Sequence, residues 1–133
     1  MEIERERDDT AIRRVFITSP ASDKKITKEG RVIMALNLSF EAPRMPLSMA
    51  IMAGGLEPMA EVCIIDASNE KMQRPELRER MAAFRPDLVI VNCSTPTIYH
   101  DVAVVRDARE LGAMTAMFGQ HADAIPDEVM RDL

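Results

Sequence analysis

The sequence predicts an α/β domain built on a doubly wound parallel β-sheet. Four short apolar runs recur along the chain, and none of them alternates apolar with polar side chains: Val15–Thr18, Val62–Ile65, Leu88–Cys93 and Met114–Phe118. Continuous apolar strands are typical of a parallel sheet that is covered on both faces. Helical patterns separate the runs, and strands that alternate with helices through right-handed crossovers produce a doubly wound sheet.

Each predicted strand ends at residues that favour turns. Ser19-Pro20 follows the first strand and Asp66 the second. Ser94-Thr95-Pro96 closes the third strand, and Gly119 closes the fourth. These stops predict short strands with polar connections at their carboxyl ends.

Two of the helices are predicted from residues that favour helix ends. The segment 46–56 begins at Pro46, which suits a first helical turn, and has Gly54-Gly55 near its far end. The last helix is expected to begin near Pro126-Asp127-Glu128, because acidic side chains stabilise a helix N-terminus.

The other two helices are predicted from apolar periodicity. The segment 75–84 places Leu77, Met81 and Phe84 on one face. The segment 98–111 is expected to bury one stripe and to leave its acidic residues in water. That stripe comprises Ile98, Val102, Val105, Ala108 and Leu111, and the acidic residues are Asp101, Asp107 and Glu110.

Composition narrows the class of protein. The 133 residues fit one domain, predicted to span 14–133 after a charged N-terminal arm at 1–13. The net charge of −5 argues against a nucleic-acid-binding face. No apolar run reaches membrane-spanning length, and the charged start does not resemble a signal peptide. Cys63 and Cys93 lie in apolar runs, which predicts buried reduced thiols and a cytoplasmic protein.

Two irregularities stand out in this plan. The connection from Ser19 to Met45 is about 27 residues long, whereas such loops ordinarily run roughly 2–6. It follows the first strand at the sheet edge where these folds bind ligands, although a tolerated surface insertion is the alternative. The chain also stops at Leu133, where a fifth strand is expected next, which favours a fragment of a longer protein with its fifth strand removed by truncation.

Polar residues gather after the third and fourth strands. Hydroxyl-bearing Ser94, Thr95 and Thr97 lie at a helix N-terminus, and Gly119-Gln120-His121 follows the next strand. Hydroxyls and backbone N–H groups at this edge can hold a polar or anionic ligand. Helix capping by Ser94 or Thr95 is the alternative.

Several familiar sites are absent from the sequence. It contains no Gly-x-x-x-x-Gly-Lys-Ser/Thr loop, no Gly-x-Gly-x-x-Gly after the first strand and no Gly-x-Ser-x-Gly elbow. The two histidines, His100 and His121, lie at separate loop–helix junctions and give weak support for a metal pair.

Taken together, several segments resemble a known module. These segments are Met45-Pro46-Leu47-Ser48-Met49-Ala50, Glu61–Ala67, Phe84–Val91, Ser94–Thr97, Gly119–Ala122 and Ile125–Val129. Their order and spacing resemble the N-terminal cobalamin-binding domain of cobalamin-dependent radical SAM proteins. That group includes methyltransferases and the anaerobic oxidative cyclase of the magnesium-protoporphyrin ester.

The resemblance implies a Rossmann-like fold with the flavodoxin-like strand order 2-1-3-4-5. It also implies that the dimethylbenzimidazole tail of cobalamin lies between the sheet and its helices. In that family, Ser/Thr groups after the third strand contact the tail, and a Gly-Gly after the fourth strand leaves room for it. Gln120 stands where the second glycine is expected, which predicts altered tail docking. The cofactor-binding residues expected are Ser19, Pro20, Ser94, Thr95, Pro96, Thr97, Gly119, Gln120 and His121.

The resemblance implies neither catalytic residues nor a cobalt ligand in this chain. The Asp-x-His-x-x-Gly motif of other cobalamin domains is missing after the first strand, where Ser19–Lys24 contains no histidine. Cys63 and Cys93 cannot provide the Cys-x3-Cys-x2-Cys motif that holds a [4Fe–4S] cluster. The cluster, S-adenosylmethionine and radical catalysis are therefore expected only in a radical SAM domain, in a longer parent chain or a partner.

A second interpretation stays open: a non-catalytic α/β interaction domain that has lost the cofactor. The missing second glycine favours it, whereas the long first loop and the Ser-Thr-Pro-Thr run favour cobalamin. Either way, the uncharged fourth strand, Met114–Phe118, is expected at an open sheet edge. Self-association through this strand, or by exchange of terminal elements, is therefore predicted.

Overall fold

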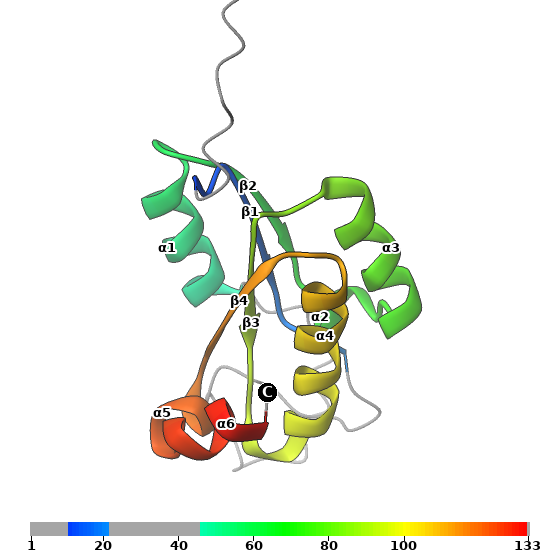
Figure 1. Ribbon diagram of the computed structural model, residues 1–133, viewed down its shortest axis with the longest axis vertical. Coiled ribbons are helices and arrows are strands. Elements are labelled where there is room, and N and C mark those ends of the chain that lie inside the picture. The colour runs from blue at the N-terminus through cyan, green and yellow to red at the C-terminus, as the bar shows by residue number, and fades with distance from the viewer. Residues whose placement is uncertain (1–10, 22–45, 133) are drawn as a thin grey trace, which may run out of the picture.

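A four-stranded parallel sheet forms the centre of the protein in a computed structural model that describes residues 11–21 and 46–132. The strands are β1 (Arg14–Thr18), β2 (Glu61–Ile65), β3 (Leu88–Asn92) and β4 (Met114–Phe118). They lie in the order β2-β1-β3-β4, and every neighbouring pair is parallel (Figure 1). The predicted α/β class, the four strands and their order are confirmed.

The four predicted helices are present, with ends within one or two residues of expectation. They are α1 (Leu47–Leu56), α3 (Arg74–Phe84), α4 (Ile98–Glu110) and α6 (Pro126–Asp132). Three short elements were not predicted: α2 (Ala67–Glu70), α5 (Gln120–Ala124) and the 3₁₀ turn η1 (Thr95–Thr97). Such short segments carry too little periodicity to be recognised in a sequence.

Helix α1 covers one face of the sheet (Figure 1). Met49 and Ala53 of α1 pack on Val15 and Ile17 of the central strand β1. Among the described residues, the side chains of β1 on this face are fully buried, and those on the strands toward β4 become more exposed. In one row across the sheet, Val15 is fully buried, Leu88 is half-buried and Met114 is 61% exposed.

Helices α3 and α4 cover the opposite face, which makes the sheet doubly wound (Figure 1). This core contains Phe16, Val89 and Val91 from the strands. As predicted, α3 contributes buried Leu77 and Met81, with Phe84 half-buried at its end.

The predicted stripe of α4 was right for Val105 and Ala108, which are fully buried, and wrong for Val102, Leu111 and two of the acidic residues. Asp101 is fully buried and Asp107 is 2% exposed, whereas Val102 is only half-buried and Leu111 is 36% exposed. An unpaired buried carboxylate is costly. Hydrogen-bonding partners on neighbouring elements remove that cost for both carboxylates.

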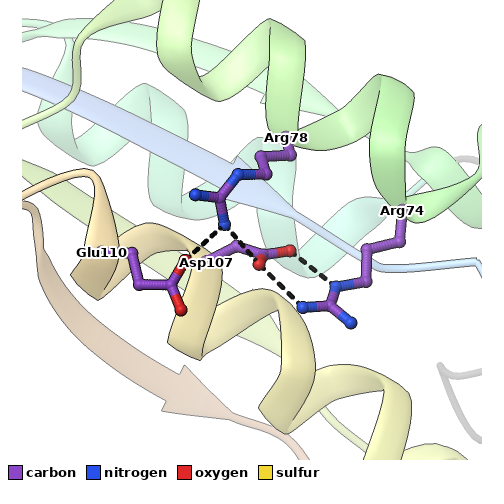
Figure 2. A network of polar contacts seen from close by, with 4 residues as sticks. All are labelled: Arg74, Arg78, Asp107 and Glu110. Carbon is purple, nitrogen blue, oxygen red and sulfur yellow. Dashed lines mark hydrogen bonds and ion pairs between the residues drawn. The ribbon is translucent and has the colours of Figure 1, made fainter.

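Asp107 joins α4 to α3 through two arginines (Figure 2). Arg74 donates two hydrogen bonds to its carboxylate, at 2.7 and 2.8 Å, and Arg78 donates a third at 2.6 Å. Arg78 also reaches Glu110, the more exposed acid one turn further along α4, at 2.8 Å. The Arg74 guanidinium, followed by that of Arg78, holds the pKa of Asp107 below its ordinary value against the opposing effect of burial.

The other expectations have mixed outcomes. Cys93 is buried as expected, but Cys63 is only half-buried, and burial raises the pKa of its thiol. In the described ranges, no helix combines the length and apolar character needed to cross a membrane. Most of the predicted N-terminal arm and most of the long loop from Ser19 to Met45 lie outside the described residues.

Candidate functional site

The candidate site is the carboxyl edge of the sheet. Parallel strands end at the same edge, so the connections after β1, β3 and β4 begin there side by side. In Figure 1 this edge is the lower end of the sheet, next to α5 and α6. All of the site residues predicted from the sequence lie on these three connections.

Ser94 and Thr97 form a buried polar cluster with Asp101 at the start of α4. The Thr97 hydroxyl donates to the Asp101 carboxylate at 2.7 Å, and the backbone N–H of Ser94 donates to the same carboxylate at 3.2 Å. The Ser94 and Thr97 hydroxyl oxygens lie 2.7 Å apart, and both residues are buried. These hydroxyls therefore stabilise the β3–α4 connection, and neither faces solvent.

Gly119 brings the connection after β4 against the end of β3. Its φ of +117° lies in a region that only glycine adopts without strain. A Cβ atom here would overlap the carbonyl oxygen of Cys93 and lie 2.9 Å from Oδ1 of Asn92. The space beside this glycine is therefore filled by the protein's own backbone.

Thr95 and His121 are the predicted site residues that meet across the edge. The Thr95 hydroxyl and Nδ1 of His121 lie 3.0 Å apart, which joins the connection after β3 to α5. Thr95 is exposed and His121 is half-buried. Pro96 and Gln120 beside them are exposed as well, so this group presents polar atoms to solvent.

Ser19 and Pro20 are buried at the end of β1 and serve a different junction. The backbone of Ser19 donates to the carbonyl of Ile65 at 3.4 Å and accepts from the N–H of Ser68 at 3.0 Å. The neighbouring Thr18 hydroxyl also donates to the Ile65 carbonyl, at 2.7 Å. Within the described residues, these contacts tie the end of β1 to the β2–α2 connection.

A hollow of about 410 Å³ lies beside the edge, between α4 and the pair α5 and α6. Of the predicted site residues, only His121 lines it. The lining residues are Ile98, Tyr99, Val102, Arg106, His121, Ile125, Glu128 and Val129.

The sequence carries a signal for this hollow that is not part of the predicted site. Tyr99, Val102 and Arg106 are spaced by three and four residues, which places them on one side of α4. Val102 was assigned to the buried stripe instead, so this side of α4 was not recognised as a separate surface.

Metal-binding chemistry has no cluster to support it among residues 11–21 and 46–132. No group of three or more His, Cys, Asp or Glu side chains there is placed to hold an ion.

Comparison of the chain with protein-family models, with curated proteins and with solved structures found no match.

Proposed function

We propose that this chain is a cobalamin-binding α/β module that serves a radical SAM domain in the same or a partner chain. The observation that carries the proposal is the meeting of Thr95 and His121 at the carboxyl edge, 3.0 Å apart, with Gln120 exposed beside them. The order β2-β1-β3-β4 supports it, because open α/β sheets bind ligands at the carboxyl ends of their strands.

The chemistry of the exposed groups fits cobalamin. The ligand carries a rim of amide groups and a phosphate in its nucleotide tail, all of which form hydrogen bonds. The Thr95 hydroxyl and the His121 imidazole supply hydrogen-bonding groups of the matching kind, and Gln120 occupies the position of the expected second glycine beside them. Because these groups include no carboxylate, ammonium or guanidinium, the proposed site suits a large polar ligand better than a small, highly charged anion.

The buried residues of the predicted set are assigned a supporting role. Ser94 and Thr97 hold the β3–α4 connection through Asp101, and Gly119 lets the connection after β4 approach Cys93. In this proposal they fix the positions of Thr95 and His121, and Ser19 and Pro20 are not ligand contacts. Bound cobalamin would supply cobalt chemistry such as methyl transfer, and this chain would bind and orient it without catalysing a reaction alone.

The test is a visible-absorption titration of hydroxocobalamin with three proteins. The wild type is expected to bind weakly, and Thr95→Val is expected to weaken binding by about 1 kcal/mol, the value of one neutral hydrogen bond. Tyr99→Ala is the control, because Tyr99 lines the neighbouring hollow and is 88% exposed. Weaker binding by Tyr99→Ala with no change in Thr95→Val would move the ligand to the hollow and refute the edge site.

A second candidate, a non-catalytic interaction domain, is favoured by one observation. The Ser94 and Thr97 hydroxyls form hydrogen bonds within the protein, and protein atoms fill the space beside Gly119. These contacts are also expected in a domain that binds no ligand. This candidate predicts that cobalamin leaves the absorption spectrum and the unfolding temperature unchanged.

A further inference from the structure

Strand β4 presents an outward-facing backbone edge. In the described part of the chain it pairs only with β3. At one end of the ladder, the backbone N–H of Met114 donates to the backbone carbonyl of Asp87. At the other end, the backbone N–H of Cys93 donates to the backbone carbonyl of Phe118. Since alternate residues of a strand point their N–H and C=O groups to the same side, Met114, Ala116 and Phe118 face β3. Thr115 and Met117 therefore direct their backbone groups away from the sheet.

We propose that a second copy of this chain pairs with that edge, antiparallel and centred on Ala116. In this register Thr115 of each copy lies opposite Met117 of the other, and each such pair exchanges two N–H···O bonds. All outward backbone groups of β4 are then used, and the two sheets join into one. The carboxyl edges of the two copies point in opposite directions, so pairing is independent of cobalamin.

The neighbouring registers use fewer backbone groups. Moving the centre to Thr115 places Met117 opposite Ala113, whose N–H already donates to the carbonyl of Ala108. Moving it to Met117 places Thr115 opposite Gly119, whose carbonyl already accepts from Asp123. Centring on Ala116 is therefore the register that satisfies the edge most completely.

The side chains of β4 are complementary to themselves in this register. The small, exposed Ala116 meets its own copy at the two-fold axis, in a non-hydrogen-bonded pair whose Cα atoms approach to about 4.5 Å. Met114, which is 61% exposed, lies opposite the half-buried Phe118 of the second copy, on the α1 side of the sheet, where cover decreases toward β4. Contacts between methionine sulfur and an aromatic ring are favourable.

Charge also favours a second copy at this edge. No charged residue occurs between Leu111 and Gly119, so the paired β4 strands bring no like charges together. The other outer strand of the described sheet, β2, begins with the exposed Glu61, and charged residues discourage pairing at an edge. One strand against one strand is a small interface, so we expect a dissociation constant between about 10 µM and about 1 mM.

The first test is sedimentation velocity over a concentration series that spans this range. Wild type is expected to sediment faster as concentration rises. Thr115→Pro removes an N–H that points outward and leaves the ladder to β3 intact, so it should shift the protein to monomer. Thr115→Val keeps the N–H and a similar shape, and it should associate as wild type does.

A second variant covers the case in which proline disturbs folding. Ala116→Lys places an exposed ammonium on each monomer but brings two ammonium groups together in the dimer. It should stay folded by circular dichroism and remain monomeric at every concentration. Association of Ala116→Lys equal to that of wild type would overturn the proposal.

Disulfide cross-linking tests the register itself. Ala116→Cys should form a covalent dimer under mild oxidation, because its paired Cα atoms lie within disulfide range. Met114→Cys is the matched control: Met114 is 61% exposed, but its own copy lies four residues away along the strand, at about 13 Å. Wild type, with Cys63 and Cys93, gives the background. Equal cross-linking of the two variants would refute the pairing. A wild type that stays monomeric at every concentration would also refute it, and would show that the chain covers the edge itself.

Discussion

The backbone at Gly119 lies against the carbonyl oxygen of Cys93, closely enough that no Cβ atom fits between them. This contact joins the connections that leave β3 and β4 at the carboxyl edge of the sheet. A second link, the hydrogen bond from the β3 connection to α5 between Thr95 and His121, lies next to it. The positions of the exposed polar groups in the candidate site therefore depend on one glycine.

Replacement of Gly119 by alanine should destabilise the protein by about 3 kcal/mol or more. Strain at a positive φ costs about 1–3 kcal/mol, and the overlap with the Cys93 carbonyl adds to it. Gly112 is the control, because it also has a positive φ, of +86°, but no atom lies within 4 Å of its added Cβ. Gly112→Ala should lose only about 1–2 kcal/mol in urea unfolding. Equal losses would show that the close approach to Cys93 contributes nothing.

Thr97 and Thr95 should respond differently to the same substitution. Thr97→Val removes a buried donor from Asp101 and should lower the free energy of unfolding by about 1–3 kcal/mol. Thr95→Val alters an exposed residue and should leave that free energy within about 0.5 kcal/mol of wild type. Thermal unfolding of both variants without ligand makes the comparison. Similar stability losses would mean that Thr95 is part of the structural cluster.

Asp107 should make the protein more sensitive to acid. Its pKa lies below the ordinary value of 3.8, so its contribution to stability is fully present above the unfolded-state pKa and is lost as pH falls through the lowered folded-state pKa. Asp107→Asn should cost about 1–3 kcal/mol at pH 7. It should also flatten the loss of stability between about pH 5 and pH 2.

Urea unfolding at a series of pH values measures this effect. Glu110→Gln is the control, because Glu110 pairs only with Arg78 in the drawn network and its side chain is 64% exposed (Figure 2). It should change stability little at any pH, since exposed ion pairs are weak. An unchanged acid limb in Asp107→Asn would show that Arg74 and Arg78 do not perturb this carboxyl.

Gln120→Gly should tighten cobalamin binding. The resemblance places a glycine here, and removing the exposed side chain frees space and backbone beside Gly119 for the nucleotide tail. Isothermal titration calorimetry compares this variant with Gln120→Ala, which shortens the side chain but keeps a Cβ atom. Weaker binding by both variants would make the Gln120 amide a ligand contact.

The strands were predictable because each is a continuous apolar run closed by a turn residue. Continuous burial predicts a parallel sheet before any contact is known, and the sheet order followed from the resemblance. The extent of helix α4 and the burial of Val105 and Ala108 were predicted, but the burial of Asp101 and Asp107 was not. Asp101 and Asp107 lie on the same buried side of the helix as its apolar residues. Their hydrogen-bonding partners come from the β3–α4 connection and from α3. Such long-range partners leave no local pattern in a sequence.

The candidate site was predicted as a location more accurately than as a set of contacts. Alternation of strands and helices places the connections after β3 and β4 at one edge, and Thr95 and His121 do meet there. A run of hydroxyls does not reveal which members face inward, so Ser94 and Thr97 were not distinguished from Thr95. The positive φ of Gly119 and its overlap with Cys93 depend on the packing of two distant connections.

Equilibrium dialysis of the wild-type chain against cobalamin and against cobinamide, which lacks the nucleotide tail, is the decisive test of cobalamin binding at the carboxyl edge. Cobalamin is expected to be retained at ligand concentrations below about 1 mM, which corresponds to a binding free energy of about −4 kcal/mol or better. Cobinamide is expected to be retained less, and Thr95→Val should reduce the difference between the two ligands. No retention of cobalamin at about 1 mM would refute the cobalamin site and leave the interaction domain as the function that fits the structure.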